Sequence, residues 1–152
     1  MKVFISGCGI MSSLGNSPTE MFGQLIEGQS AVRNIEAWKD FKGLNCRLGA
    51  PAAAYDISKL PRTARRTMSR MSEMASLASQ QALAQAGLTM ADLDFPRTLL
   101  SLGSTTGSPI ALEDYFNSIH KNNGVQSQSG TAFFKVMNHS VASNVAVALG
   151  FN

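Results

Sequence analysis

The sequence predicts a layered α/β fold in which helices are covered on more than one side. Two stretches with helical spacing carry almost no charge, residues 71–86 and 140–150. Two short runs typical of buried strands, residues 2–6 and 98–102, are each followed by a glycine. A helix that is free of charge all round is usually buried all round, and a sheet of two strands cannot cover two such helices. We therefore expect the chain to be part of a larger α/β fold.

The bulk composition excludes several classes of protein. The chain has 152 residues, the length of one domain, with 44% hydrophobic and only 15% charged residues. Its 13 basic and 10 acidic residues give a net charge of +3, too small to indicate a nucleic-acid partner. No stretch is long enough to span a membrane. The two cysteines form neither a disulfide framework nor a metal site, so we expect a cytoplasmic protein without a cofactor or metal.

The first predicted strand, residues 2–6, runs into a loop with glycines at positions 7 and 9. This pair invites a dinucleotide-binding interpretation, but Ser12 stands where that motif has its third glycine, and we reject it. A helix then begins after Ser17, which can cap it, with Pro18 in the first turn and Glu20 completing a capping box. Gly28 predicts its end. Residues 29–61 are expected to be irregular, with scattered anchors that include Trp38 and Tyr55.

Arginines are concentrated immediately before the first uncharged helix. Arg62, Arg65, Arg66 and Arg70 fall within nine residues, and Glu73 is the only charge between them and Gly87. Because cations oppose the dipole at a helix N-terminus, we expect the first three on a separate turn, with the helix itself capped by Ser69. A solvated basic turn is the simplest interpretation. The alternative is a docking patch for an acidic partner or a phosphate group.

The second predicted strand, residues 98–102, leads into a loop of small residues, 103–109. Ligands bind at such strand ends in α/β sheets. We expect a helix over residues 110–121, a polar loop over 122–130, and the uncharged helix 140–150 as a neighbour of the first uncharged helix. We interpret His120 as a surface histidine and His139 as a packing histidine.

Taken in order, these segments resemble the N-terminal part of the β-ketoacyl-(acyl-carrier-protein) synthases. The matching pieces are VFISGCGIMSSLG at residues 3–15, LIEGQSAV at 25–32, ALAQAGL at 82–88, LGSTTG at 102–107, and Phe133-Phe134. Ser13 departs from the family's usual proline, and Thr105-Thr106 from a glycine and a hydrophobic residue. The resemblance implies a thiolase-like layered α/β/α/β/α fold, of which residues 1–152 would be an incomplete, N-terminal portion.

The resemblance also implies an activity. The family elongates fatty acids or polyketides by decarboxylative Claisen condensation of a malonyl-carrier protein with an acyl thioester. Its nucleophilic cysteine, its histidines and its lysine would lie beyond Asn152. Cys8, Cys46, His120 and His139 match none of them, so we assign no catalytic residue to this chain and expect the chain alone to be inactive.

Site residues follow from the same resemblance. Thr106 matches the position that limits the depth of the acyl pocket, and Phe134 a residue offered across the dimer interface. Arg62, Arg65 and Arg66 match a basic turn that would dock an acidic, phosphopantetheinylated acyl carrier protein. We expect Arg70 to pack or to pair with Glu73.

Three alternatives remain open. The first is a non-catalytic subunit of the chain-length-factor kind, which would make the dimer a heterodimer rather than a homodimer. The second is a thiolase that acts on coenzyme A thioesters, against which the basic turn and the Phe-Phe pair argue. The third is a stand-alone binding domain, which the predicted uncovered helices disfavour. In every ketosynthase-like case we expect exposed apolar surface on the isolated chain.

Overall fold

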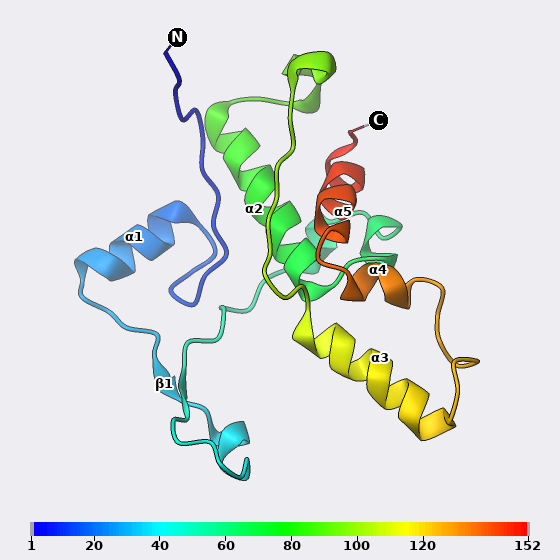
Figure 1. The fold of residues 1–152 in the computed structure, drawn as a ribbon. Coiled ribbons are helices and arrows are strands. Elements are labelled where there is room, and N and C mark those ends of the chain that lie inside the picture. The colour runs from blue at the N-terminus through cyan, green and yellow to red at the C-terminus, as the bar shows by residue number, and fades with distance from the viewer. Residues whose placement is uncertain (1, 152) are drawn as a thin grey trace.

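The computed structural model describes residues 2–151. Helices dominate it, and one short antiparallel pair of strands supplies its sheet (Figure 1). The α-helices and strands are α1 (Pro18–Ile26), β1 (Arg33–Asn34), β2 (Leu48–Gly49), α2 (Arg70–Ala86), α3 (Pro109–Asn122), α4 (Ala132–Val136) and α5 (Ser140–Leu149). Single 3-10 turns connect several of them. Among the described residues, no helix is both long and apolar enough to cross a membrane.

Helix α1 begins as the sequence predicts. The Ser17 hydroxyl accepts a hydrogen bond from the Glu20 N–H at 3.2 Å, and Pro18 occupies the first helical position. The Glu20 carboxylate reaches back to the N–H of Asn16 at 2.8 Å, one residue before the expected partner. Gly28, with φ of +68°, follows the last turn in the left-handed region. The capping prediction is confirmed with this shift of one residue.

The two uncharged helices are neighbours, as predicted. Helix α2 packs along α5 (Figure 1). The most buried residues of α2 are Ser72, Ser76 and Leu77, and those of α5 include Val141 and Val145. Serine occupies little volume, so the two helices approach closely across this face.

A second face of α2 is covered by the segment around Gly7 and Gly9. A Cβ atom on Gly7 would lie 2.1 Å from the Ala82 carbonyl oxygen, and one on Gly9 would lie 1.9 Å from that of Ala78. The glycines therefore allow the backbone to lie directly on the helix. Two side chains of α2 complete the contact: the Gln85 amide oxygen accepts from the Cys8 N–H at 2.6 Å, and the Gln81 amide oxygen from the Ile10 N–H at 3.0 Å.

The prediction of two short buried strands is wrong for the described chain. Residues 2–6 and 98–102 have no strand partner within the described chain and run as irregular segments. Their apolar side chains are exposed, with Ile5 at 92% and Leu99 at 87%. A strand exists through the ladder that it forms with a neighbour. The sequence pattern shows which segments have side chains suited to a strand. Residues 2–151 contain no partner strand for either segment.

The irregular region between α1 and α2 contains the small sheet. β1 and β2 pair antiparallel, with Arg33 opposite Gly49 and Asn34 opposite Leu48. The Trp38 ring lies against Gly49, where a Cβ atom would come within 3.0 Å of it. Further along, a 3-10 turn, Met90–Asp92, is closed by a reciprocal capping box between Thr89 and Asp92. Its two hydrogen bonds from Thr89 lower the pKa of the Asp92 carboxyl.

Candidate functional site

The arginines lie on a separate turn, as the sequence predicts. A 3-10 turn, Ala64–Arg66, precedes α2, and Ser69 is the N-cap residue of that helix. Arg62 and Arg66 are exposed, whereas Arg65 is half-buried. We call residues 62–66 the arginine turn. The Ser69 hydroxyl is buried and makes no hydrogen bond within residues 2–151, so the expected capping bond is absent although the cap position is correct.

Apolar residues fix the underside of the arginine turn. Leu60, Ala64 and Met68 are each no more than 3% exposed, and they form one core cluster with Leu77 of α2 and Ala148 of α5. The turn therefore sits on the junction of the two uncharged helices. Its exposed guanidinium groups are presented from a buried base.

A polar network ties the same turn to both helices. Asn144 of α5 is 5% exposed; its amide nitrogen donates to the Thr67 carbonyl at 3.2 Å and to the Ser72 hydroxyl at 3.0 Å. The Thr67 hydroxyl donates to the Asn144 amide oxygen at 2.7 Å. Both N–H groups and the oxygen of the amide thus have partners, which fixes the orientation of the side chain.

Arg70 packs rather than pairs. Its guanidinium carbon lies 5.8 Å from the centre of the Tyr55 ring, within range of a cation–π contact. The Tyr55 hydroxyl donates to the Glu73 carboxylate at 2.9 Å. Within the described residues, no ion pair joins Arg70 directly to Glu73. The packing half of the prediction is confirmed, and the connection between the two charges runs through Tyr55.

Arg65 faces a different environment from its two neighbours. Its Nε atom is buried and has no hydrogen-bond partner within residues 2–151. Hydrogen bonds from the Ser58 hydroxyl and N–H lower the pKa of the Asp56 carboxyl, and the charges of Lys59 and Arg65 lower it further. The charge of Arg65 therefore acts partly on Asp56 within the protein, whereas Arg62 and Arg66 are exposed to solvent.

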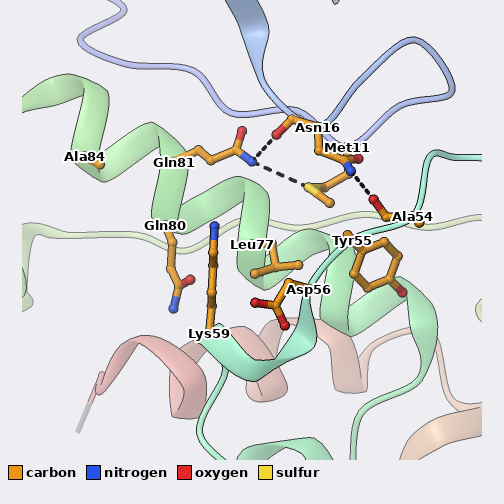
Figure 2. Close-up of a pocket in the computed structure, with 10 residues that line it drawn as sticks. All are labelled: Met11, Asn16, Ala54, Tyr55, Asp56, Lys59, Leu77, Gln80, Gln81 and Ala84. Carbon is orange, nitrogen blue, oxygen red and sulfur yellow. Dashed lines mark hydrogen bonds between the residues drawn. The ribbon is translucent and has the colours of Figure 1, made fainter. Parts of the chain in front are cut away.

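A pocket of about 350 Å³ lies beside this region, between α2 and the two loops around residues 11–16 and 54–59 (Figure 2). Figure 2 shows its walls tied together: the Asn16 side chain donates to the Ala54 carbonyl at 2.6 Å, and the Gln81 amide donates to the Asn16 carbonyl. Lys59 and Asp56 line its lower part. The hydrogen bonds explain how the loop before the arginine turn is held on α2.

The two predicted acyl-pocket residues lie on adjoining segments. Thr106 is exposed in the small-residue loop, and Phe134 is 46% exposed on α4. The loop is seated on the end of α4, because a Cβ atom on Gly107 would come within 2.8 Å of the Val136 carbonyl oxygen. The Asn138 amide also donates to the Ser104 carbonyl at 3.3 Å. The Phe133 and Phe134 rings meet edge to face, 5.9 Å apart.

The two cysteines and the two histidines of the chain all have exposed side chains. Cys8 and Cys46 are free and exposed. His120 is exposed, as predicted, but the prediction of a packing role for His139 is wrong, because its side chain is exposed at the N-cap of α5. No cluster of three or more metal-binding side chains occurs among residues 2–151.

A family model, a sequence relative and a solved structure that this chain matches are all of β-ketoacyl synthases. The family model of the β-ketoacyl synthase N-terminal domain matches residues 1–152. The 3-oxoacyl-[acyl-carrier-protein] synthase 1 of Escherichia coli K12 is 35% identical over 109 residues, 71% of this chain and 27% of that enzyme. A β-ketoacyl synthase from Burkholderia phymatum superposes with a TM-score of 0.82 at 29% identity, over 95% of this chain and 36% of that one.

A more distant structure, a type II polyketide ketosynthase in complex with its acyl-carrier protein, superposes with a TM-score of 0.74 at 19% identity, over 97% of this chain and 40% of that one. At this identity the likeness concerns the fold alone. The chain spans about a third of the length of the relatives that it matches.

These matches place the chain in the class of thiolase-like condensing-enzyme folds, and the predicted fold class is confirmed. Within that class, the chain belongs to the β-ketoacyl synthase family and corresponds to its N-terminal domain. Family membership removes the unrelated stand-alone binding domain from the alternatives.

Two structural residues of the site were not predicted from the sequence. Asn144 is the single amide in the uncharged stretch 140–150, and a lone amide on an uncharged helix was the available signal. The sequence marks Tyr55 only as an anchor of the irregular region. Its links to Arg70 and Glu73 depend on packing between distant segments and leave no local pattern.

Proposed function

We propose that this chain forms the N-terminal part of a β-ketoacyl-(acyl-carrier-protein) synthase, which extends fatty acid or polyketide chains by decarboxylative condensation of a malonyl-carrier protein with an acyl thioester. Membership of the β-ketoacyl synthase family supports the reaction class. We expect the complete protein to be a cytoplasmic dimer, with the nucleophilic cysteine and the catalytic histidines supplied outside this chain. If that cysteine is missing from the complete protein, the chain-length-factor role applies instead.

The observation that carries the proposal is the arginine turn. Two exposed guanidinium groups, those of Arg62 and Arg66, stand on a turn whose base is buried. A pair of cations on a turn anchored by buried residues suits an acidic protein partner, since complementary charge steers encounter and fixes orientation. We assign the docking of the acyl carrier protein to Arg62 and Arg66, with Arg65 contributing through its charge. The related fold seen with its carrier protein supports this choice of partner.

The same proposal gives roles to the loop and helix around Thr106. Thr106 would line the acyl pocket, and Phe134 would be offered to a second subunit across the dimer interface. Both side chains are accessible, and the loop that carries Thr106 rests on the helix that carries Phe134. A structural change at the subunit interface would therefore alter the position of the loop that lines the pocket.

The docking assignment is tested by charge reversal. In the complete protein, Arg62→Glu with Arg66→Glu is expected to weaken binding of the acyl carrier protein about 100-fold at low salt, because attraction becomes repulsion at two positions. The dissociation constant is measured by titration calorimetry at two or more ionic strengths. The dependence on salt is expected to flatten, since fewer attractive charge pairs remain to be screened.

Arg33→Glu is the matched control. It reverses an exposed arginine on a different element, β1, and is expected to leave affinity and its salt dependence close to wild type. Circular dichroism confirms that each variant is folded. Unchanged affinity and salt dependence in the folded double variant would exclude the arginine turn as the docking site.

A further inference from the structure

The buried polar network around Asn144 joins segments that are far apart in the sequence. Thr67 and Asn144 are separated by 77 positions, and Ser72 and Asn144 by 72. Asn144 and Ser72 are 5% and 0% exposed, so the network lies inside the protein. Thr67 directly follows Arg66 and is the C-cap residue of the arginine turn. One side chain of α5 therefore holds both the backbone and the side chain of the residue that directly follows this turn.

The hydrogen bonds of Asn144 add directionality to a helix contact that is otherwise formed by apolar packing. The Val141, Val145 and Ala148 side chains show that α5 packs with apolar groups on either side of Asn144. Burying an amide is costly unless all its polar atoms are satisfied. Here each is satisfied, two of the three bonds by Thr67. The amide thus places a directional restraint where α5 meets the residue that follows the arginine turn.

From this placement we infer that Asn144 is a positioning residue for the docking of the carrier protein. It fixes the angle at which the arginine turn leaves the core, and through Thr67 it fixes the backbone of Arg66. This role rests on the proposed docking function of Arg62 and Arg66. Apolar burial of Ala64 and Met68 holds the turn down, and the amide selects its orientation.

Asn144→Leu in the complete protein is the direct test. Leucine keeps the volume close but removes all three hydrogen bonds. The dissociation constant for the acyl carrier protein is expected to rise about fivefold, as pre-organisation of the arginine pair is lost. The KM for a carrier-bound substrate should rise in parallel, while kcat and the KM for a carrier-free pantetheine thioester stay near wild type. Replacing a residue that matters only for folding would change the kinetic constants for the two substrates to the same extent.

A milder pair of variants keeps the test independent of folding. Thr67→Val removes the hydroxyl that donates to Asn144 and keeps the shape, whereas Thr67→Ser keeps the hydroxyl. The first is expected to reproduce part of the loss of affinity, and the second to restore it. Val145→Ala is the stability control, because Val145 is fully buried on the same helix and its side chain cannot hydrogen-bond to the turn.

The outcomes separate this inference from the docking proposal. If Arg62→Glu with Arg66→Glu weakens binding but Asn144→Leu and Thr67→Val do not, the positioning role is overturned and the docking site stands. The positioning role is also overturned if Val145→Ala weakens binding as much as Asn144→Leu does. If the arginine variants themselves bind normally, the docking proposal fails, whatever the Asn144 variants do.

Discussion

At the level of single residues, Tyr55 links two parts of the site that the sequence keeps apart. Its ring receives the Arg70 guanidinium, its hydroxyl donates to Glu73, and it packs on the core cluster below the arginine turn. Burial raises the pKa of Tyr55 from its ordinary 10.0 to about 12, the Glu73 hydrogen bond and charge add to this, and Arg70 opposes it. The protonated hydroxyl is therefore the form that the fold favours.

This shift predicts a dependence of stability on pH. Because the pKa is higher in the folded state, the contribution of Tyr55 is complete below about pH 10 and is lost as the pH rises through about 12. Tyr55→Phe is expected to cost about 1 kcal/mol near neutral pH, a figure reduced for partial exposure of the ring. Urea unfolding of both proteins from pH 8 to 12 should show the two curves converging at the alkaline end.

Tyr115→Phe, the same change at the other tyrosine of the chain, is the matched control. It is expected to leave the shape of the wild-type pH dependence intact. A wild-type protein and a Tyr55→Phe variant that differ by the same amount at pH 8 and at pH 12 would contradict the assignment.

Thr106 carries a second prediction at this level. Replacing it with phenylalanine in the complete protein is expected to shorten the longest acyl products, since a bulky ring would fill pocket volume beside the loop. Product lengths are read by mass spectrometry of the carrier-bound acyl chains. Thr105→Phe, one position earlier in the same exposed loop, is the control. An unchanged product profile for Thr106→Phe would remove Thr106 from the pocket.

Residue roles were predictable where they depended on type and local spacing. Arg62, Arg65 and Arg66 would oppose the helix dipole, so they were expected before the helix, and the structure places them on a separate turn there. The inward turn of Arg65 was not predictable, because it depends on where Asp56 and the core below it are placed. The exposure of His139 was not predictable for a similar reason: its position in the sequence does not show which way a cap residue faces.

At the level of elements, the Gly7–Gly9 segment lies with its backbone directly against the backbone of α2. Gly9→Ala would place a methyl group 1.9 Å from the Ala78 carbonyl oxygen. The main chain of a helix cannot yield at low cost, so we expect the complete protein to lose about 3 kcal/mol of stability. Thermal and urea unfolding measure the loss.

Gly23→Ala provides the opposite case. Gly23 lies inside α1, and no atom lies within 4 Å of the position that its Cβ would occupy. The change is expected to stabilise by about 0.5–1 kcal/mol through helix propensity. If both glycine variants behave alike, the close approach of the segment to α2 is not present in solution.

Helices were predicted better than strands, and the reason is physical. A helix closes its hydrogen bonds within its own segment, so caps such as Ser17 and the spacing of α3 and α5 are readable locally. The pattern at residues 2–6 and 98–102 describes side chains suited to a ladder but not the ladder itself. The strands β1 and β2 do form a ladder but were not predicted, because two residues in each strand are too few for an alternating pattern to be recognised.

At the level of the whole molecule, apolar surface is the dominant feature. Val3, Phe4 and Ile5 are more than 80% exposed, and large apolar side chains of α1, α3 and α4 also face solvent. Surfaces of this extent usually mark contacts with further protein. The layered class was predictable because uncharged helices require cover on several sides, whereas the identity of the covering elements needed the family resemblance.

The exposed surface predicts the behaviour of residues 1–152 expressed alone. We expect self-association, strong binding of a hydrophobic dye, and sedimentation as mixed oligomers in analytical ultracentrifugation. Replacing Phe4 and Ile5 with serine should reduce the dye signal measurably, whereas the same change at the buried Leu60 should not improve behaviour. A stable, monodisperse wild-type monomer would contradict this prediction.

The anchoring of the arginine turn also bears on how such surfaces can be recombined. A chimera that exchanges residues 62–66 as a cassette would transplant the charges without the amide that orients them, which sits 77 positions away from Thr67. A transferable unit would need Thr67, Ser72 and Asn144 to travel together with the loop. On the docking proposal, the choice of partner would then be encoded in a discontinuous set of residues, of which Ser72 and Asn144 are buried.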